Sequence, residues 1–278
     1  MTGPFAGRVA VVTGASAGTG RELARLLHSR GARVLVTGRD ADRTRAIARE
    51  LGSPLLLADN LDLDTVAELG HRILNEADQI DYLFSNAGAA LPDRHTTRDG
   101  NEPNYQVNAL APLLLERLLT PALTAAPRGR VVATSSRSHH GATLTHGNVA
   151  TELQNTAPGA HQRYARAKLA ALIVHADARA QPGALQTVDV HPGIVATDFG
   201  RYMGRTGAVL KFLATPFLSS PSSAAEVLAA NAARLDVDHS YYHRRTPRGP
   251  SVLVEDREVR DEVMKDVEQR LAVWLSGS

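Results

Sequence analysis

The chain has 278 residues, of which 43% are hydrophobic and 22% charged, and its formal net charge is +2. This composition is ordinary for a globular protein with a sizeable core, and the length fits one large domain or two small ones. The basic residues are dispersed rather than interleaved with aromatics, which argues against nucleic acid as a partner. The absence of cysteine excludes disulfides, thiolate catalysis and cysteine-ligated metal sites.

We expect neither an export signal in residues 1–7 nor a membrane-spanning segment in the interior of the chain. Residues 1–7 are too short and polar to form a signal peptide before the first apolar run begins. No stretch approaches the ~18 consecutive apolar residues that a spanning helix needs. We therefore expect a cytoplasmic protein with no stable membrane insertion.

Short apolar runs alternate with amphipathic stretches through the first part of the chain. The runs predict strands at residues 9–13, 33–37, 55–58 and 82–84. Apolar residues at helical spacing predict helices at residues 21–30, 42–51 and 66–74. Glycine follows the first two helices, as is usual at a helix C-terminus.

The alternation continues in the second part. Strands are predicted at residues 130–134 and 187–190, and helices at 105–123 and 162–180. The sequence Ser223-Ala224-Ala225-Glu226 matches a capping box that would open a further helix. Strands alternating with helices predict an α/β fold of Rossmann type: one doubly wound parallel sheet with helices on both faces. No Pro/Gly/Ser linker divides the chain, so we expect a single domain over residues 1–278.

Two segments interrupt this rhythm. Residues 138–161 are predicted to form a polar loop, and residues 198–221 are irregular and carry Phe199, Phe212 and Phe217. Both follow strands, and open α/β sheets bind ligands at the carboxyl ends of their strands. We expect both segments to form walls of a pocket, with residues 198–221 as a lid over the substrate.

A glycine-rich turn joins the first strand to the first helix. Gly14, Gly18 and Gly20 would let the backbone approach a pyrophosphate, whose charge is met by N–H groups at the helix N-terminus. An ordinary tight turn would also explain the glycines, but their place after the first strand favours the binding role. No Lys-Ser/Thr pair follows Gly20, which argues against the phosphate loop of nucleotide hydrolases.

Tyr164 and Lys168 lie four positions apart on a predicted helix, so their side chains share a face. An ammonium near a phenol favours the phenolate and should lower the tyrosine pKa from ~10 towards neutrality, and an oxidised nicotinamide would add positive potential. Such a phenol can donate a proton to a carbonyl as hydride arrives, or remove one from an alcohol. The chain has only three lysines and six tyrosines. A chance pair at this spacing is therefore expected in about one such sequence in fifteen.

The spacing Gly14-x-x-x-Gly18-x-Gly20 resembles the short-chain dehydrogenase/reductase family. Further elements of that family follow in order: Asp59, Ser85-Asn86-Ala87-Gly88 with serine for the family's first asparagine, Asn108, Ser136, Tyr164-x-x-x-Lys168 and Pro192-Gly193-x-x-x-Thr197. The resemblance covers roughly residues 8 to 200. It implies a catalytic set of Asn108, Ser136, Tyr164 and Lys168.

The resemblance gives each remaining catalytic residue a role. Ser136 would hold the substrate oxygen and stabilise developing alkoxide character, with Ser135 and Ser138 as competitors for the role. Asn108 would order the water that passes protons from Lys168 to solvent. Taken alone, a strand-end serine more often satisfies a turn, and a mid-helix asparagine more often bonds back to its own helix.

The resemblance also implies a nicotinamide dinucleotide cofactor, with Asp59 over the adenine ring. Its expected contacts are Gly14, Ser16, Gly18, Thr19, Gly20, Arg39, Asp59, Asn60, Asn86, Ala87, Gly88, Tyr164, Lys168, Pro192, Gly193, Val195 and Thr197. NAD enzymes of this fold usually place a carboxylate where this chain has Gly38. The Arg39 guanidinium that follows suits a 2′-phosphate, so we predict a preference for NADP(H) over NAD(H). The neighbouring Asp40 makes this assignment less specific, and the alternative is that Arg39 lies in an ordinary solvated loop and binds no phosphate.

The pair His139-His140 raises the question of a metal. No third ligand stands at a recognisable spacing, and the family's chemistry needs no metal. We predict no metal site, and place the pair in a pocket rim or a plain loop.

Residues 99–102 and 135–140 resemble the retinol-dehydrogenase-like subgroup, as does the tail from Tyr241 to Trp274 more loosely. The apolar lid indicates a lipophilic or aromatic carbonyl or alcohol, such as a retinoid, steroid or polyketide-like ketone. The alternatives are a detoxifying reductase of small aldehydes and ketones, and a non-catalytic dinucleotide-binding regulatory protein. By likeness to the family, helices 105–123 and 162–180 would form the interface of a homodimer or homotetramer.

Overall fold

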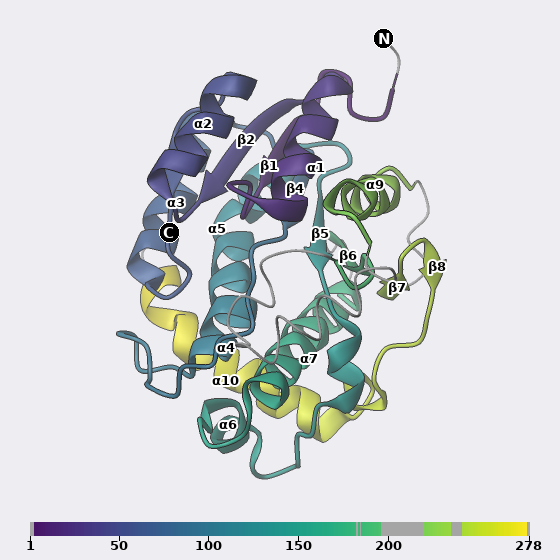
Figure 1. Cartoon of the computed structure of the whole chain (residues 1–278). Helices are drawn as coiled ribbons and strands as arrows, with labels where there is room; N and C mark the ends of the chain where they lie inside the picture. Colours follow the sequence, from purple (N-terminus) through teal and green to yellow (C-terminus); the bar gives the residue numbers. More distant parts are fainter. Residues whose placement is uncertain (1–2, 182, 184, 196–218, 235–240, 277–278) are drawn as a thin grey trace.

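The computed structural model describes residues 3–181, 183, 185–195, 219–234 and 241–276 (Figure 1). Its centre is one sheet with the strand order β3-β2-β1-β4-β5-β6-β7-β8. The strands are β1 (Val9–Val12), β2 (Arg33–Gly38), β3 (Leu56–Leu57), β4 (Tyr82–Ser85), β5 (Arg130–Thr134), β6 (Gln186–His191), β7 (Tyr241–His243) and β8 (Thr246–Pro247). All neighbouring strands are parallel except β7 and β8, which pair antiparallel. The predicted doubly wound Rossmann-type sheet is confirmed.

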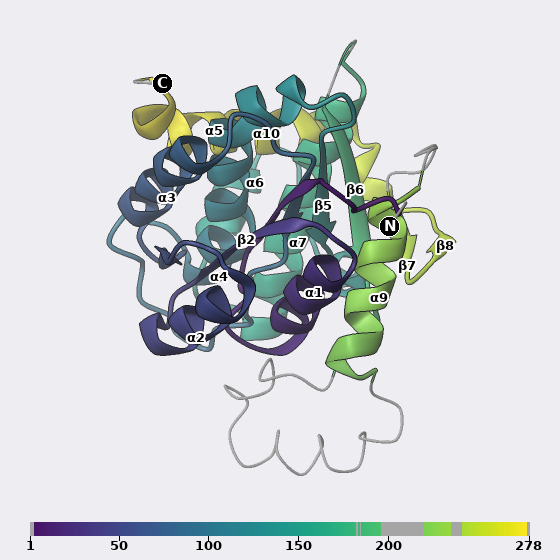
Figure 2. The same ribbon diagram turned by 90° about the horizontal axis from the view of Figure 1, so that it is seen from above.

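Helices cover both faces of this sheet (Figure 2). The regular helices are α1 (Gly18–Ser29), α2 (Ala41–Leu51), α3 (Leu63–Glu76), α4 (Pro103–Tyr105), α5 (Ala111–Ala125), α6 (Val149–Gln154), α7 (Ala160–Arg179), α9 (Pro221–Ala232) and α10 (Arg257–Leu275). One apolar cluster joins α1, α2 and α9 to the sheet, and the other joins α3, α5, α7 and α10. Because strands buried on both faces need apolar side chains throughout, their sequences are near-continuous hydrophobic runs.

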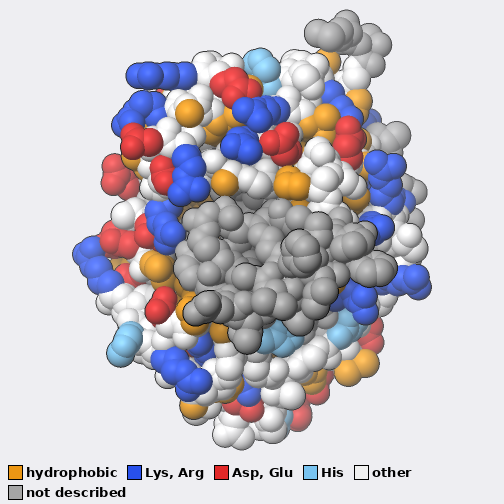
Figure 3. All heavy atoms as spheres, in the orientation of Figure 1, with side chains coloured by type: hydrophobic (Ala, Val, Ile, Leu, Met, Phe, Trp, Pro, Cys, Tyr) orange, Lys and Arg blue, Asp and Glu red, His pale blue; other side chains and the backbone are white. Residues whose placement is uncertain are grey.

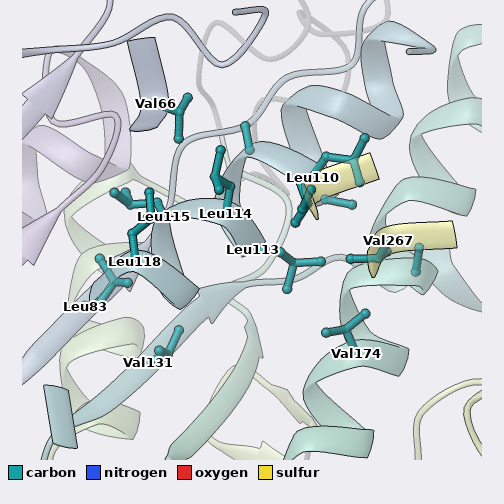
Figure 4. Packing of buried hydrophobic residues seen from close by; sticks show 14 of the residues in the cluster. Val66, Leu83, Leu110, Leu113, Leu114, Leu115, Leu118, Val131, Val174 and Val267 are labelled. Atoms are coloured by element: carbon teal, nitrogen blue, oxygen red, sulfur yellow. The ribbon is translucent and has the colours of Figure 1, made fainter. Parts of the chain in front are cut away.

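The larger cluster holds the helix that carries the catalytic tyrosine candidate. Figure 4 shows Leu113 and Leu114 of α5, Val131 of β5, Val174 of α7 and Val267 of α10 converging on one region. All five side chains are at most 5% exposed. This packing fixes α7 and α5 relative to the carboxyl ends of β4 and β5.

The predicted helix over residues 105–123 is built in three pieces. It starts as α4, passes through one π-helical turn (Gln106–Leu110) and continues as α5. A π-helical turn inserts an extra residue into a helix and is often found at functional sites. Here the wide turn contains Asn108.

Two sequence predictions are corrected. The segment 138–161 is not all loop, because α6 forms within it and buries Val149 and Leu153. The cap of α9 is Ser220 rather than Ser223: the Ser220 hydroxyl accepts the Ser223 N–H at 3.1 Å, and Pro221 takes the first helical position.

The C-terminal part contains elements that the sequence patterns did not predict. These are the edge strands β7 and β8, a 3₁₀ turn (Val252–Val254) and α10. Helix α10 packs against α5, α6 and α7. The two helices expected to form a subunit interface therefore lie under a helix of their own chain.

Some expectations fall outside the described residues. Thr197 lies there, as does all of the expected lid at residues 198–221 except its last three residues. Within the described ranges, no helix is both long and apolar enough to cross a membrane. On the face of the molecule shown in Figure 3, basic side chains are interspersed with acidic ones rather than gathered into a stripe.

Candidate active site

A cleft of about 550 Å³ opens at the carboxyl ends of the parallel strands. It runs from the β1–α1 turn, past the ends of β2 and β4, to the β5 end and the start of α7. Apart from Asn108 and Thr197, every predicted cofactor or catalytic residue lines it, including Ser16, Thr19, Ala87, Pro192 and Val195. Asn108 lies behind this cleft, against a smaller internal cavity.

The β1–α1 turn is shaped for close approach of a ligand. Gly14 and Gly18 adopt left-handed conformations, with φ of +68° and +55°. A Cβ at Gly20 would stand 2.7 Å from the Asn86 side-chain nitrogen and would overlap the carbonyl oxygen of Gly14. At Ala17, which precedes α1, no side chain caps the helix, and the residues of its first turn line the cleft. These features suit an anion such as a pyrophosphate.

Hydrogen bonds lock this turn to the end of β4. The Thr13 hydroxyl accepts the N–H groups of Asn86 and Ala87, both at 2.9 Å. The Asn86 side chain donates to the Thr13 carbonyl at 3.0 Å and accepts from the Thr134 hydroxyl at 3.3 Å. Asn86 directly follows β4, and from this place its side chain joins the ends of the two neighbouring strands, β1 and β5.

Arg39, which follows β2, and Asp59, which follows β3, lie together on the cleft wall. Arg39 Nη1 lies 3.7 Å from Asp59 Oδ2, and both side chains are more than one third exposed. Asp40 caps α2 by accepting the Arg43 N–H at 3.0 Å and the Arg43 Nε at 2.7 Å. The carboxylate next to Arg39 is therefore engaged by its own helix. Asn60 donates to the Val107 carbonyl at 3.2 Å, which ties this wall to the π-helical turn.

The predicted proton-transfer pair meets the predicted serine. Lys168 Nζ lies 5.9 Å from the centre of the Tyr164 ring and donates to the Thr134 carbonyl at 2.8 Å. The Tyr164 side chain is hydrogen-bonded to Ser136. The Ser136 hydroxyl also accepts the Ser138 N–H at 3.2 Å. Of the three competing serines, Ser136 is the one that acts on the pKa of the tyrosine.

Burial dominates the electrostatics of the pair. Burial raises the pKa of Tyr164 to about 12, against the opposing effect of the Ser136 hydrogen bond. Burial lowers the pKa of Lys168 to about 8, against the opposing effect of Asp189 and Glu116. The expected lowering of the phenol pKa by Lys168 is not found in the free protein, because burial favours the neutral phenol.

The Asn108 side chain is fully engaged with backbone. It accepts the Ala89 N–H at 3.1 Å and donates to the carbonyls of Ala89 and Asn104 at 2.8 and 3.0 Å. The bond to Asn104 is the back-bonding expected of a mid-helix asparagine. Asn108 therefore holds the chain just after Gly88, and shares the internal cavity with Lys168.

Within the described residues neither member of the histidine pair lines the cleft; both lie in a 3₁₀ turn (Arg137–Gly141), where His140 is exposed. His139 is fully buried, bonds through Nδ1 to the Ser136 carbonyl, and meets the ring of Tyr241 edge-on at 4.7 Å. The sequence around His139 is polar and did not predict this burial, which results from contact with Tyr241 of β7. In the described ranges, no group of three or more His, Asp or Glu residues could hold a metal.

Sequence reasoning missed a buried ion pair beside the tyrosine. Arg163 Nη1 lies 2.6 Å from Glu102 Oε1, and both side chains are only 1% exposed. The signal was weak: Glu102 precedes Pro103, as a helix cap does, but nothing in the sequence marks Arg163 as its partner.

Comparisons with known proteins agree with this geometry. Residues 8–146, half of the chain, match the family model described as short chain dehydrogenase. The chain belongs to the short-chain dehydrogenase family. A protein of Streptomyces sp. (strain C5) named for daunorubicin C-13 ketoreduction is 34% identical over 87% of this chain and 85% of its own. Human retinol dehydrogenase 13 is 30% identical over 91% of this chain and 81% of its own.

Solved structures place the fold in the same family. A protein from Mycobacterium paratuberculosis has a TM-score of 0.71 at 26% identity, covering 96% of this chain and 94% of its own. A metagenomic short-chain oxidoreductase, solved in complex with NADP, has a TM-score of 0.62 at 27% identity, covering 88% of this chain and all of its own. This short-chain dehydrogenase is thus an oxidoreductase of CH–OH groups, similar to retinol dehydrogenases, in a family that binds NAD(P).

Proposed function

We propose that this enzyme uses NADP(H) to interconvert a carbonyl and an alcohol on a lipophilic or aromatic substrate, with Tyr164 as the acid and base. The observation that carries the proposal is the Ser136–Tyr164 hydrogen bond above Lys168, at one end of the cleft that begins at the glycine-rich turn. The proposal treats residues 1–278 as one catalytic domain, with residues 198–221 covering the substrate.

The residues around the cleft fit a dinucleotide. Gly14, Gly18 and Gly20 line the cleft at the N-terminus of α1, and the absence of a Cβ at Gly20 lets that helix pack directly against the Gly14 backbone. Arg39 would meet the 2′-phosphate, and Tyr164 and Lys168 would flank the nicotinamide ribose. When bound, the cofactor supplies or accepts the hydride.

The chain's own residues handle the proton. In reduction, Ser136 holds the substrate oxygen by a hydrogen bond, which stabilises the negative charge that develops there. Tyr164 Oη gives its proton to that oxygen, and in oxidation it takes the proton back. Lys168, held by the Thr134 carbonyl, keeps a positive charge beneath the tyrosine ring. The raised pKa of Tyr164 keeps the phenol protonated and ready to donate at neutral pH.

The substrate class is supported by the relatives and by the cleft. Daunorubicin and retinol, which appear in the relatives' names, are both large molecules with extended apolar parts. The cleft lining includes apolar side chains, and one of them, Leu91, is bonded through its carbonyl to Arg163, the neighbour of Tyr164. Such pockets bind apolar ligands and orient them with a few polar groups.

The experiment follows NADPH oxidation with a panel of retinoid, steroid, aromatic polyketide and small aldehyde carbonyls. We expect Tyr164→Phe to lower kcat by about 10²- to 10⁴-fold, because the proton donor is lost. NADPH affinity, measured by fluorescence, should stay within a few-fold.

Tyr82→Phe is the matched control, since its hydroxyl bonds to the Pro4 carbonyl away from the cleft. Unchanged turnover in Tyr164→Phe would contradict the role of Tyr164, and tight NADPH binding with no turnover of any carbonyl by the wild type would support a dinucleotide-binding regulatory protein instead. A panel in which only small polar carbonyls react would favour the detoxifying reductase.

A further inference from the structure

A second cavity, of about 20 Å³, adjoins the cleft, and Lys168 lines both. Its walls include Asn108, Glu116, Lys168, His175 and Asp189. A cavity of this size can hold one water molecule when two or more polar groups face it. The cavity therefore connects the proposed catalytic lysine to side chains that the proposed reaction does not use.

Those side chains form a buried network of charges. His175 Nε2 lies 2.8 Å from Glu116 Oε2, and His175 Nδ1 lies 3.0 Å from Asp189 Oδ1. Arg179 Nη1 lies 3.1 Å from Asp189 Oδ2. Glu116 comes from α5, Asp189 from β6, and the two cations from α7. The histidine and both carboxylates are less than 10% exposed.

Two buried oxygen atoms of residues at the cavity could form hydrogen bonds with a water molecule. Glu116 Oε1 and the Ser135 hydroxyl have no hydrogen-bond partner among the described residues, and both residues line the cavity. Buried polar atoms in folded proteins are almost always hydrogen-bonded, to protein or to ordered water. Lys168 has three N–H donors, of which one goes to the Thr134 carbonyl. A water in the cavity could join Glu116 to Lys168.

The network carries compensating charge. The two carboxylates raise the pKa of His175 to about 10, although burial alone would lower it. His175 and Arg179 in turn hold the pKa of Asp189 below its usual value. The charged groups that bear on Lys168 are Glu116 on α5 and Asp189 on β6, and both favour its ammonium form. Tyr164 lies on its other side, one turn earlier on the same helix.

We propose that Glu116, His175 and Asp189 are positioning residues for Lys168, which act through the internal cavity to set how firmly the lysine keeps its proton. Glu116 and Asp189 stabilise the ammonium, and His175 limits their effect by neutralising part of their charge. The inference rests on the proposed function only in giving Lys168 a part in the reaction; the network itself acts on the lysine in the free protein.

The first test measures Lys168 directly. The chain has three lysines, so ¹³C-labelled lysine side chains give few NMR signals, and Lys168→Met assigns one of them. We expect Glu116→Gln to lower the pKa of Lys168 by about one pH unit, because a nearby negative charge is lost. His175→Gln should raise it, because a positive charge is lost and both carboxylates stay. Glu268→Gln, at a partly exposed pair with Arg117, is the control and should change nothing.

The second test measures the pH dependence of kcat for carbonyl reduction with saturating NADPH. The alkaline limb should move to lower pH in Glu116→Gln and to higher pH in His175→Gln. Lys168 signals that stay fixed in both variants, or that move in the same direction, overturn the inference. Signals that move oppositely while the kcat profile stays fixed support the network and count against the role of Lys168 in the proposed function. If His175→Gln does not fold, Glu116→Gln and Asp189→Asn should still both lower the lysine pKa.

Discussion

The pKa values of Tyr164 and Lys168, both on α7, are shifted so that each side chain favours its neutral form. Tyr164 has a pKa of about 12 and Lys168 a pKa of about 8, because each is buried. Below about pH 8 the lysine is charged while the phenol keeps its proton. This is the protonation state that carbonyl reduction requires, since the phenol must give its proton to the substrate oxygen.

We expect cofactor preference to depend on Arg39, whose side chain is 59% exposed. We expect Arg39→Gln to raise the KM for NADPH about 10- to 100-fold, which corresponds to the ~1.5–3 kcal/mol of a hydrogen bond to a charged group. The KM for NADH should stay within about twofold, because NADH carries no 2′-phosphate. Steady-state kinetics with both cofactors measures the ratio.

Arg45→Gln is the control for Arg39. It removes another guanidinium of the same region, which pairs with Asp42 and does not line the cleft. Equal losses with NADPH and NADH in Arg39→Gln would show that the arginine supports the wall through Asp59 rather than a phosphate.

At the scale of elements, one arginine connects α7 to the segment that follows the Asn86-Ala87-Gly88 turn. Besides its pair with Glu102, Arg163 donates to the carbonyls of Leu91 and Pro92 at 3.2 and 3.0 Å. Glu102 also accepts the Tyr105 N–H at 2.6 Å and thereby caps α4. The position of Tyr164 on α7 is thus tied to the start of the helix that carries Asn108.

We expect Arg163→Met to lower the free energy of unfolding by about 3–5 kcal/mol, because it leaves the Glu102 carboxylate buried without its partner. Arg98→Met, at a side chain that is 69% exposed and pairs with Asp62 and Asp64, should cost less than about 1 kcal/mol. Urea denaturation of the two variants checks the difference. Similar small losses in both would mean that the buried pair is replaceable by apolar packing.

The sequence predicted the elements whose signal is local, and missed features that depend on distant partners. The Tyr164–Lys168 spacing and the apolar run of β5 are readable from neighbouring residues. The valines of α10 recur every four residues from Val259, but no local pattern says which surface they cover. The contacts of His175 with Glu116 and Asp189 join three elements, and the raised pKa of Tyr164 follows from burial that only the folded chain creates.

For the molecule as a whole, helix α10 bears on the expectation, drawn from family likeness, that α5 and α7 form a subunit interface. It crosses α5, α6 and α7 on one side of the sheet (Figures 1 and 2). Val259, Val263, Val267 and Leu271 are all buried in the cluster that those helices share. The hydroxyl of Tyr105 donates to Asp266 at 2.8 Å, which fixes α10 beside the π-helical turn.

This cover leaves little apolar surface on α5 and α7 for a second copy of the chain. We therefore expect sedimentation velocity at micromolar concentration to show a monomer, since a dimer through α5 and α7 would require α10 to leave its place.

Val263→Asp should lower the free energy of unfolding by more than about 2 kcal/mol, because it buries a charge. Val273→Asp, at a side chain that is 77% exposed, should stay within about 0.5 kcal/mol. A stable wild-type dimer with cross-links between copies of α5 and α7, or equal effects of the two valine substitutions, would show that α10 does not cover this face in solution.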